Sequence, residues 1–282
     1  MSRKAAEAAL AAGELDECRK ALFDAVRENA SDHELRAFLF QFCCVTGDWG
    51  RALKQLDVLG ELKPDTLDFV NDYRTVIRAE QVREAVWAGK LAPPVFGEPR
   101  EWIAQLVQAQ TYEARGEAQA AHDLRAEALE AAPADAGDLD GVAFDWCADA
   151  DTRLGPVAEL MLNGEYHWIA FSDIAQLEMH PPQNLRDLVW SVCILTLSNG
   201  GTFPVFMPVR YPGAVESGDP DLMLSRKTDF RALYGEHAAG EGQRMFATDA
   251  DDRPVLEARL LRFNAAMESA LAAQSNPEPD DG

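Results

Sequence analysis

The 282-residue sequence lacks the features that would place it in a membrane or outside the cell. It has no run of about 18 apolar residues, the length that predicts a transmembrane helix. Its first residues do not predict a signal peptide, because the Ala-rich stretch is short and interrupted by Glu7 and Glu14. Its five cysteines form no CxxC pair, and their odd number favours buried, reduced thiols over disulfides. We therefore expect a soluble, cytoplasmic protein.

Basic residues are scarce. The sequence has 26 Lys and Arg against 48 Asp and Glu, which gives a net charge of -22. Such a surface repels phosphate backbones and anionic lipids, so neither nucleic acid nor a membrane is an expected partner. The acidity either serves solubility alone or favours a basic or amphipathic partner segment.

Signatures of catalysis and cofactor binding are also missing. The sequence contains no HExxH, HxH or GxSxG pattern, and no glycine-rich phosphate loop follows a predicted strand. No cysteine stands close enough to a histidine to suggest a zinc site. The five histidines are interpreted as structural or surface residues: His33, His122, His167, His180 and His237. We expect no enzyme activity, no cofactor and no metal.

One acidic cluster keeps an alternative open. Asp145, Asp149 and Asp151 precede Arg153 closely, and several carboxylates together can hold a divalent cation or act as acid and base. Their spacing does not match an EF-hand loop. These residues are therefore either helix and turn caps with buried Asp–Arg pairs at a domain junction, or the site of a metal-binding protein or enzyme.

Glycines at regular spacing predict a helical repeat in the first half. Gly13 and Gly47 are 34 residues apart, and Gly116 follows after nearly twice that interval. Pro64 and Pro133 each come 17 residues after one of these glycines, where proline ends a helix. A 34-residue period is typical of tetratricopeptide repeats. The alternative is a generic helical bundle.

Local patterns predict further helices and one loop. Ser31 to Glu34 matches a capping box at a helix start. A long helix is predicted over residues 66–87, and the proline-rich residues 91–99 are predicted to form a loop. Apolar residues at helical spacing predict an amphipathic helix over residues 253–273.

The second half has the composition of strands. Residues 166–171 are aromatic and β-prone, and residues 189–197 and 202–209 flank the turn SNGG as a predicted hairpin. Pro204 and Pro208 cannot donate to a ladder, so the second hairpin strand is expected at an edge or a bulge.

The predicted fold class is a multidomain α and β protein. A tetratricopeptide-like α-helical repeat domain, residues 1–136, precedes a smaller α+β domain with an antiparallel hairpin or sheet, residues 137–274. The acidic end, residues 275–282, is predicted to be disordered.

Four motifs follow one another in the second half: DADTRLGP (149–156), GEYHWIAFSDI (164–174), LRDLVW (185–190) and PVRYPG (208–213). In this order, behind irregular helical repeats, they resemble the ImpE/TagJ family of type VI secretion accessory proteins, also called SciE-type virulence proteins. The resemblance implies a cytoplasmic, non-catalytic adaptor. It would bind the N-terminal segment of the small contractile-sheath subunit and act near the AAA+ ATPase that disassembles the sheath. A scaffold for another regulatory partner is the alternative.

Two surfaces are candidates for partner binding. A tetratricopeptide array offers a concave groove to a peptide, and the repeat register places Glu34, Gln41, Gln110 and Glu113 on that face. The second candidate is an aromatic and arginine set in the second half, whose members either form a contact surface or fix the fold. This set is Arg153, Trp168, Arg186, Trp190, Arg210 and Tyr211. The proline-bearing strand, if at an edge, is a further docking possibility.

Overall fold

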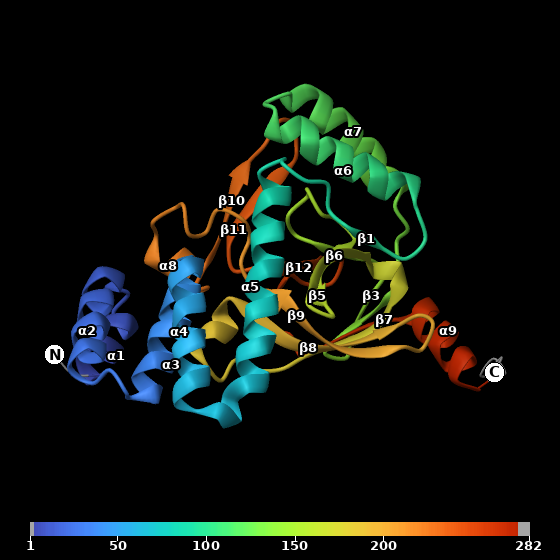
Figure 1. Ribbon diagram of the computed structural model, residues 1–282. Coiled ribbons are helices and arrows are strands. Elements are labelled where there is room, and N and C mark those ends of the chain that lie inside the picture. Colours follow the sequence, from blue (N-terminus) through green and yellow to red (C-terminus); the bar gives the residue numbers. More distant parts are fainter. Residues whose placement is uncertain (1–2, 276–282) are drawn as a thin grey trace.

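The computed structural model describes residues 3–275 and consists of a helical part followed by a sheet part (Figure 1). The helical part comprises α1 Arg3–Ala11, α2 Leu15–Glu28, α3 His33–Val45, α4 Trp49–Leu62, the 3-10 helix η1 Pro64–Thr66, α5 Leu67–Trp87, α6 Glu101–Ala114 and α7 Ala118–Ala131. This order confirms the predicted change from helices to mixed strands and helices after residue 136. The division of the chain into two domains there stays a prediction.

Three helix pairs turn at the glycines that the sequence singled out. Gly13, Gly47 and Gly116 have φ angles of 78°, 68° and 77°, which glycine adopts without a steric penalty. Each following N–H donates to the carbonyl five residues earlier, a bond that closes the preceding helix. The three bonds are Glu14 to Ala9, Asp48 to Cys43 and Glu117 to Tyr112, each 2.9 Å long. The 34-residue spacing thus reflects one repeated turn.

A nine-stranded sheet makes up most of the second part and includes β1 from the helical part; its order is β1-β6-β5-β9-β8-β7-β14-β2-β3. Its strands are β1 Val95–Phe96, β2 Gly137–Leu139, β3 Val142–Phe144, β5 Val157–Leu162, β6 Glu165–Ala170, β7 Ile174–Met179, β8 Trp190–Leu197, β9 Thr202–Pro208 and β14 Leu260–Phe263. All neighbours are antiparallel except β1 and β6. Two hairpins turn at Asp140-Gly141 and Asn163-Gly164, whose positive φ angles suit two-residue turns.

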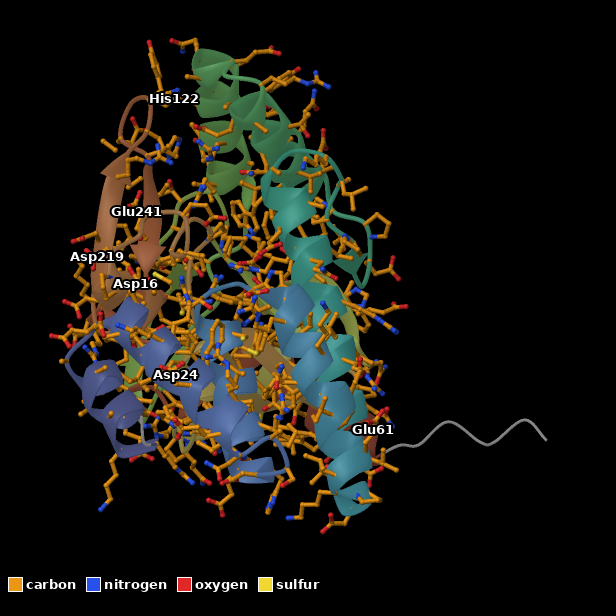
Figure 2. All side chains as sticks on the ribbon, turned by 60° about the vertical axis from the view of Figure 1, so that its left-hand side comes forward. Asp16, Asp24, Glu61, His122, Asp219 and Glu241 are labelled. Carbon is orange, nitrogen blue, oxygen red and sulfur yellow. The ribbon has the colours of Figure 1, made fainter. Side chains whose placement is uncertain are left out.

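Smaller elements complete the second part. Strands β10 Thr228–Ala232 and β11 Ala238–Gly242 form a separate ribbon, and β4 Cys147–Asp149 joins β12 Met245–Thr248 and β13 Arg253–Pro254. The remaining helices are η2 Phe171–Asp173, η3 Leu185–Leu188, α8 Pro220–Met223 and α9 Asn264–Ser275. Acidic side chains such as Asp24, Glu61 and Asp219 stand at the surface of widely separated elements (Figure 2).

The two parts share one apolar core. Alternate residues of a strand face opposite sides of the sheet, and every residue of β5 is buried because both sides are covered. Val157 and Met161 face the core that includes α5, whereas Leu160 and Leu162 face a second core on the other side. Helix α5, predicted over nearly the same residues, crosses the first side (Figure 1). Its buried face therefore positions the helical part on the sheet.

Several sequence predictions of local structure were wrong. Residues 253–263 form β13, a turn and β14, and only residues 264–275 are helical, because β14 completes its backbone pairing with β7 and β2. The predicted loop 91–99 contains β1, which pairs with β6. Residues 137–139, at the start of the predicted second domain, form β2, which pairs with β14 and β3. The disordered-tail prediction lies outside the described residues, apart from Ser275, which ends α9.

Two further corrections concern caps and edges. The N-cap of α3 is Asp32, whose carboxylate accepts from the N–H groups of Glu34 and Leu35, and not Ser31. Strand β9 forms the predicted hairpin with β8 but lies inside the sheet, between β8 and β5. It pairs with β5 only at Val205 and Phe206, so Pro204 and Pro208 fall outside that ladder. The strand is therefore not an edge for partner addition.

Candidate partner-binding groove

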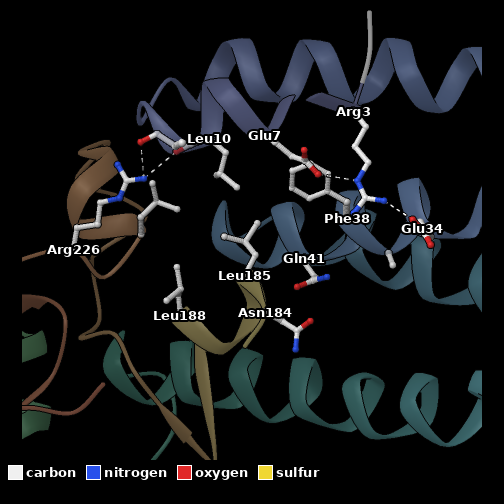
Figure 3. A pocket seen from close by; sticks show the side chains of 13 residues that line it. Arg3, Glu7, Leu10, Glu34, Phe38, Gln41, Asn184, Leu185, Leu188 and Arg226 are labelled. Atoms are coloured by element: carbon white, nitrogen blue, oxygen red, sulfur yellow. Dashed lines mark hydrogen bonds and ion pairs between the residues drawn. The ribbon is translucent and has the colours of Figure 1, made fainter. Parts of the chain in front are cut away.

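A groove of about 580 Å³ opens between α1, α3, η3 and the segment after α8 (Figure 3). It joins both parts of the chain, because its walls come from the first two helical hairpins and from loops of the sheet part. The lining residues are Arg3, Glu7, Leu10, Ala11, Glu34, Ala37, Phe38, Gln41, Asn184, Leu185, Leu188, Leu224 and Arg226.

The groove has an apolar interior and a charged rim. Leu10, Phe38, Leu185 and Leu188 are partly buried and supply the apolar side chains, while Leu224 is buried beneath them. The charged residues on the rim are exposed. An apolar groove with polar groups at its margin can bury the apolar face of a peptide.

Arginines at opposite ends of the groove hold its walls together. Arg3 on α1 pairs with Glu7 at 2.8 Å and also with Glu34 on α3. These two hydrogen-bonded carboxylates raise the pKa of Arg3 above its ordinary value. At the other end, Arg226 donates to the carbonyl oxygens of Leu10 and Ala11 at 3.0 and 3.1 Å (Figure 3). Both arginines therefore fix α1 relative to its neighbours.

The structure separates the four residues predicted to line one groove. Glu34 and Gln41 line it, and the Gln41 side chain accepts from the Arg186 N–H at 3.3 Å. Gln110 is buried and donates to the Trp87 carbonyl, whereas Glu113 accepts from Arg125 at 3.1 Å. Because α5 and the following loop intervene, the α6–α7 hairpin lies at the other end of the molecule (Figure 1). The four side chains do not share one concave face.

The aromatic and arginine set of the second half lies mostly inside the protein. Its buried members are Arg153, Trp168, Trp190, Arg210 and Tyr211, each at most 8% exposed. Arg186 is partly buried; its Nε donates to the Tyr73 hydroxyl at 2.6 Å, and its guanidinium lies over the Phe69 and Tyr73 rings. In this structure these six side chains hold elements together, and a role in partner binding stays a prediction.

A buried ionic network links α5 to the sheet. Arg83 on α5 donates to both Glu159 oxygens, at 2.9 and 3.2 Å, and to Glu80 at 2.8 Å. Arg244 pairs with Glu159 and with Asp149. Further donors to these carboxylates are the Trp87, Trp190 and Tyr211 side chains, at 2.7, 2.8 and 2.9 Å. Every charge of this buried ionic network thus has an opposite partner, as burial requires.

Glu159 pairs with two arginines and Asp149 with one, and the pKa values of these two carboxyls are shifted in opposite directions. Burial by itself raises the pKa of Glu159, but Arg83 and Arg244 together outweigh it and hold that pKa at about 2. At Asp149, burial outweighs Arg244 and raises the pKa to about 6. The network therefore stabilises the charged form of Glu159 more strongly than that of Asp149.

In the acidic cluster Asp145, Asp149 and Asp151, a candidate metal or catalytic site in the sequence, Asp149 and Asp151 form ion pairs in the structure. Asp149 contacts Arg244, and Asp151 accepts from the Arg153 Nε at 2.9 Å. Asp145 is exposed. Within residues 3–275 these carboxylates do not converge as a metal-type group. The arrangement is that of buried Asp–Arg pairs at the junction, one of the two interpretations that the sequence left open.

Other candidate chemistry is limited in the part of the chain that the structure describes. Its one group of side chains with metal-ligand donors is His122, Glu236 and His237.

The five cysteines are free and buried, as predicted, and burial raises the pKa of each thiol. No helix between residues 3 and 275 has the length and apolar content to cross a bilayer.

Sequence reasoning missed most of the groove and the centre of the buried ionic network. Arg3, Glu7 and Phe38 carry no motif, and only the tertiary approach of α1 to α3 and η3 brings them together. Glu159 offered a usable signal, because it is the one carboxylate inside the apolar strand VAELML. A charged residue in such a strand needs an opposite charge nearby.

Comparison with known proteins identifies the family. A relative from Pseudomonas aeruginosa, named type VI secretion system accessory component TagJ, is 45% identical over 258 residues, which are 92% of this chain and 90% of the relative. The chain belongs to the ImpE/TagJ family. The family model described as ImpE protein matches residues 141–262. A crystal structure of a Vibrio parahaemolyticus protein has the same fold, with a TM-score of 0.84 at 24% identity over 92% of this chain and 97% of that chain.

The residues that match the ImpE family model include a larger share of the buried ionic network than of the groove. Glu159, Arg244 and Asp149 lie within it, while the groove residues of α1 and α3 precede it. The motifs by which the sequence resembles the ImpE/TagJ family therefore consist mainly of residues that stabilise the sheet part.

Proposed function

We propose that this chain is a non-catalytic, cytoplasmic accessory component of a type VI secretion system. It binds the N-terminal segment of the small contractile-sheath subunit and acts near the ATPase that disassembles the sheath. The name of the Pseudomonas aeruginosa relative supports the accessory role. The groove between α1, α3 and η3 is the observation that supports peptide binding.

The chemistry of the groove favours an amphipathic segment. Its interior is apolar, and α1 is nine residues long, so a bound helix of about three turns would span it. The net charge of -22 favours a segment with basic residues on its polar face, because opposite charges speed association. The α1–α2 and α3–α4 hairpins, joined by equivalent glycine turns, act in this proposal as tetratricopeptide-like units.

A binding measurement with the purified sheath subunit tests the proposal. We expect calorimetry to show binding of the intact small subunit and none of a form without its N-terminal segment. Ala37→Arg, which fills the groove, and Phe38→Asp, which makes its interior charged, should each weaken binding at least tenfold. Leu271→Asp is the matched control, since Leu271 is 56% exposed on α9, away from the groove. Equal binding of the truncated subunit would overturn the proposal, and equal binding by both groove variants would remove the groove from it.

A further inference from the structure

Two histidines and one glutamate from distant parts of the chain meet between α7 and the β10–β11 ribbon. His122 lies on α7, and Glu236 and His237 lie in the turn that connects β10 to β11. One ring nitrogen of each histidine and one Glu236 carboxylate oxygen all lie within 4.8 Å of one another. Figure 2 shows His122 beside this turn, at the other end of the molecule from Asp24 on α2.

His237 is the least expected member of this cluster. The residue is only 5% exposed, and its Nε2 has no hydrogen-bond partner within the described residues. Buried polar atoms nearly always have a partner, because losing water without gaining one costs about 1–3 kcal/mol. An atom bound between these three side chains would satisfy the Nε2.

His122 is oriented toward the same point. Its Nδ1 lies 2.9 Å from the Asp123 carboxylate, a contact that fixes the ring and directs the Nε2 toward Glu236. That Nε2 lies 3.4 Å from the Glu236 carboxylate. A carboxylate behind a histidine is the usual second contact of a metal-bound imidazole.

The turn itself is shaped around His122. Gly235 has a φ of 68°, and a Cβ at this position would come within 2.3 Å of the His122 ring. Only glycine allows the turn to bring Glu236 and His237 so close to α7. The nearest cation on α7, Arg125, is compensated by Glu113 at 3.1 Å.

We propose that His122, Glu236 and His237 bind a divalent transition-metal ion of the zinc type. Two imidazoles and a carboxylate suit Zn²⁺, with ligand distances of about 2.0–2.2 Å and a fourth position for water. Ligand atoms on one such ion lie roughly 3.3 Å apart, so the cluster must contract slightly. The Glu236 side chain is 76% exposed and free to move inward. The ion would join the α6–α7 hairpin to the β10–β11 ribbon.

Titration of the metal-free, untagged full chain tests this site. Calorimetry with Zn²⁺ should show one ion per chain with micromolar or tighter affinity, and Co²⁺ should give the visible absorption of a tetrahedral site. His122→Gln and Glu236→Gln should each weaken Zn²⁺ binding at least tenfold. His180→Gln is the matched control, because His180 also lies near a glutamate, Glu178 at 4.0 Å, but outside the cluster. Its affinity should equal that of the parent.

A stability measurement guards against variants that simply misfold. With free Zn²⁺ at 100 times its dissociation constant, the unfolded-to-folded ratio of the parent should fall about 100-fold. In the His122→Gln and Glu236→Gln variants, folded by circular dichroism, the same free Zn²⁺ should lower this ratio by about tenfold or less, because they bind the ion at least tenfold more weakly. Zn²⁺ binding of equal strength in the parent and both variants, or only weak binding at many sites, would overturn the proposal.

Discussion

The rim of the groove and the buried ionic network both contain arginine–carboxylate pairs, but the rim pairs are exposed and the network pairs are buried. In the groove, Arg3, Glu7 and Glu34 pair at the surface. Beneath α5, Arg83, Arg244 and Glu159 pair out of contact with water. Exposed pairs contribute little to stability, whereas a buried charge that loses its partner destabilises strongly. The same arginine–carboxylate contact is therefore easily exchanged at the rim of the groove and fixes the arrangement of the elements in the buried ionic network.

The largest expected effect is removal of the carboxylate at the centre of the network. Glu159→Gln removes the negative charge that Arg83 and Arg244 share, so the two buried guanidinium groups are no longer fully compensated. The free energy of unfolding should fall by about 3–5 kcal/mol. Urea denaturation followed by circular dichroism measures it. Asp57→Asn is the control, since Asp57 pairs with Arg74 at the surface and its loss should cost less than about 1 kcal/mol. Equal losses would erase the contrast between the two regions.

Acid should weaken the buried network specifically. Because Arg83 and Arg244 depress the pKa of Glu159 to about 2, its contribution to stability is complete above the unfolded value of 4.5 and is lost as pH falls toward 2. The difference in unfolding free energy between the parent and Glu159→Gln should therefore shrink by about 3 kcal/mol between pH 5 and pH 2. Urea denaturation at each pH measures it. A constant difference would show that Glu159 titrates normally.

Substitution of Arg186 tests a residue that lies between the groove and the residues of α5. It belongs to η3, which forms one wall of the groove, yet its guanidinium packs on the Phe69 and Tyr73 rings of α5. Arg186→Lys keeps the charge but loses the planar stacking, and we expect a stability loss of about 1–2 kcal/mol with weaker binding of the groove ligand. Thermal unfolding and calorimetry measure the two effects. If binding weakens while stability is unchanged, Arg186 contacts the partner directly.

The smallest expected effect comes from the groove rim. Glu34→Gln removes one exposed partner of Arg3 and should change stability by less than about 1 kcal/mol. Binding of a basic segment should weaken by a few-fold at low salt and differ little from the parent at high salt, because ions screen exposed charges. Calorimetry at two ionic strengths measures this. A larger loss of stability than of binding would place Glu34 with the structural residues.

Local signals in the sequence predicted the helical part better than the sheet part. Gly13, Gly47 and Gly116 mark turns because their φ angles depend only on neighbouring residues. The apolar spacing of residues 256–263 fits a helix equally well, and only pairing with β7 and β2 makes its end a strand. Similarly, Trp168 and Trp190 are conspicuous in the sequence, but whether they face a partner or the core depends on α5.

The buried ionic network also constrains how the chain can be synthesised. Arg83 leaves the ribosome 76 residues before Glu159, and its carbonyl partner Arg210 comes later still. At about 5–20 residues per second, the nascent α5 spends roughly 4–15 s without that carboxylate. During this time Arg83 and the neighbouring aromatic side chains face water or other molecules. Co-translational folding of the helices can therefore finish only when the strands arrive, so the emerging N-terminal half depends on the C-terminal half for its final stability.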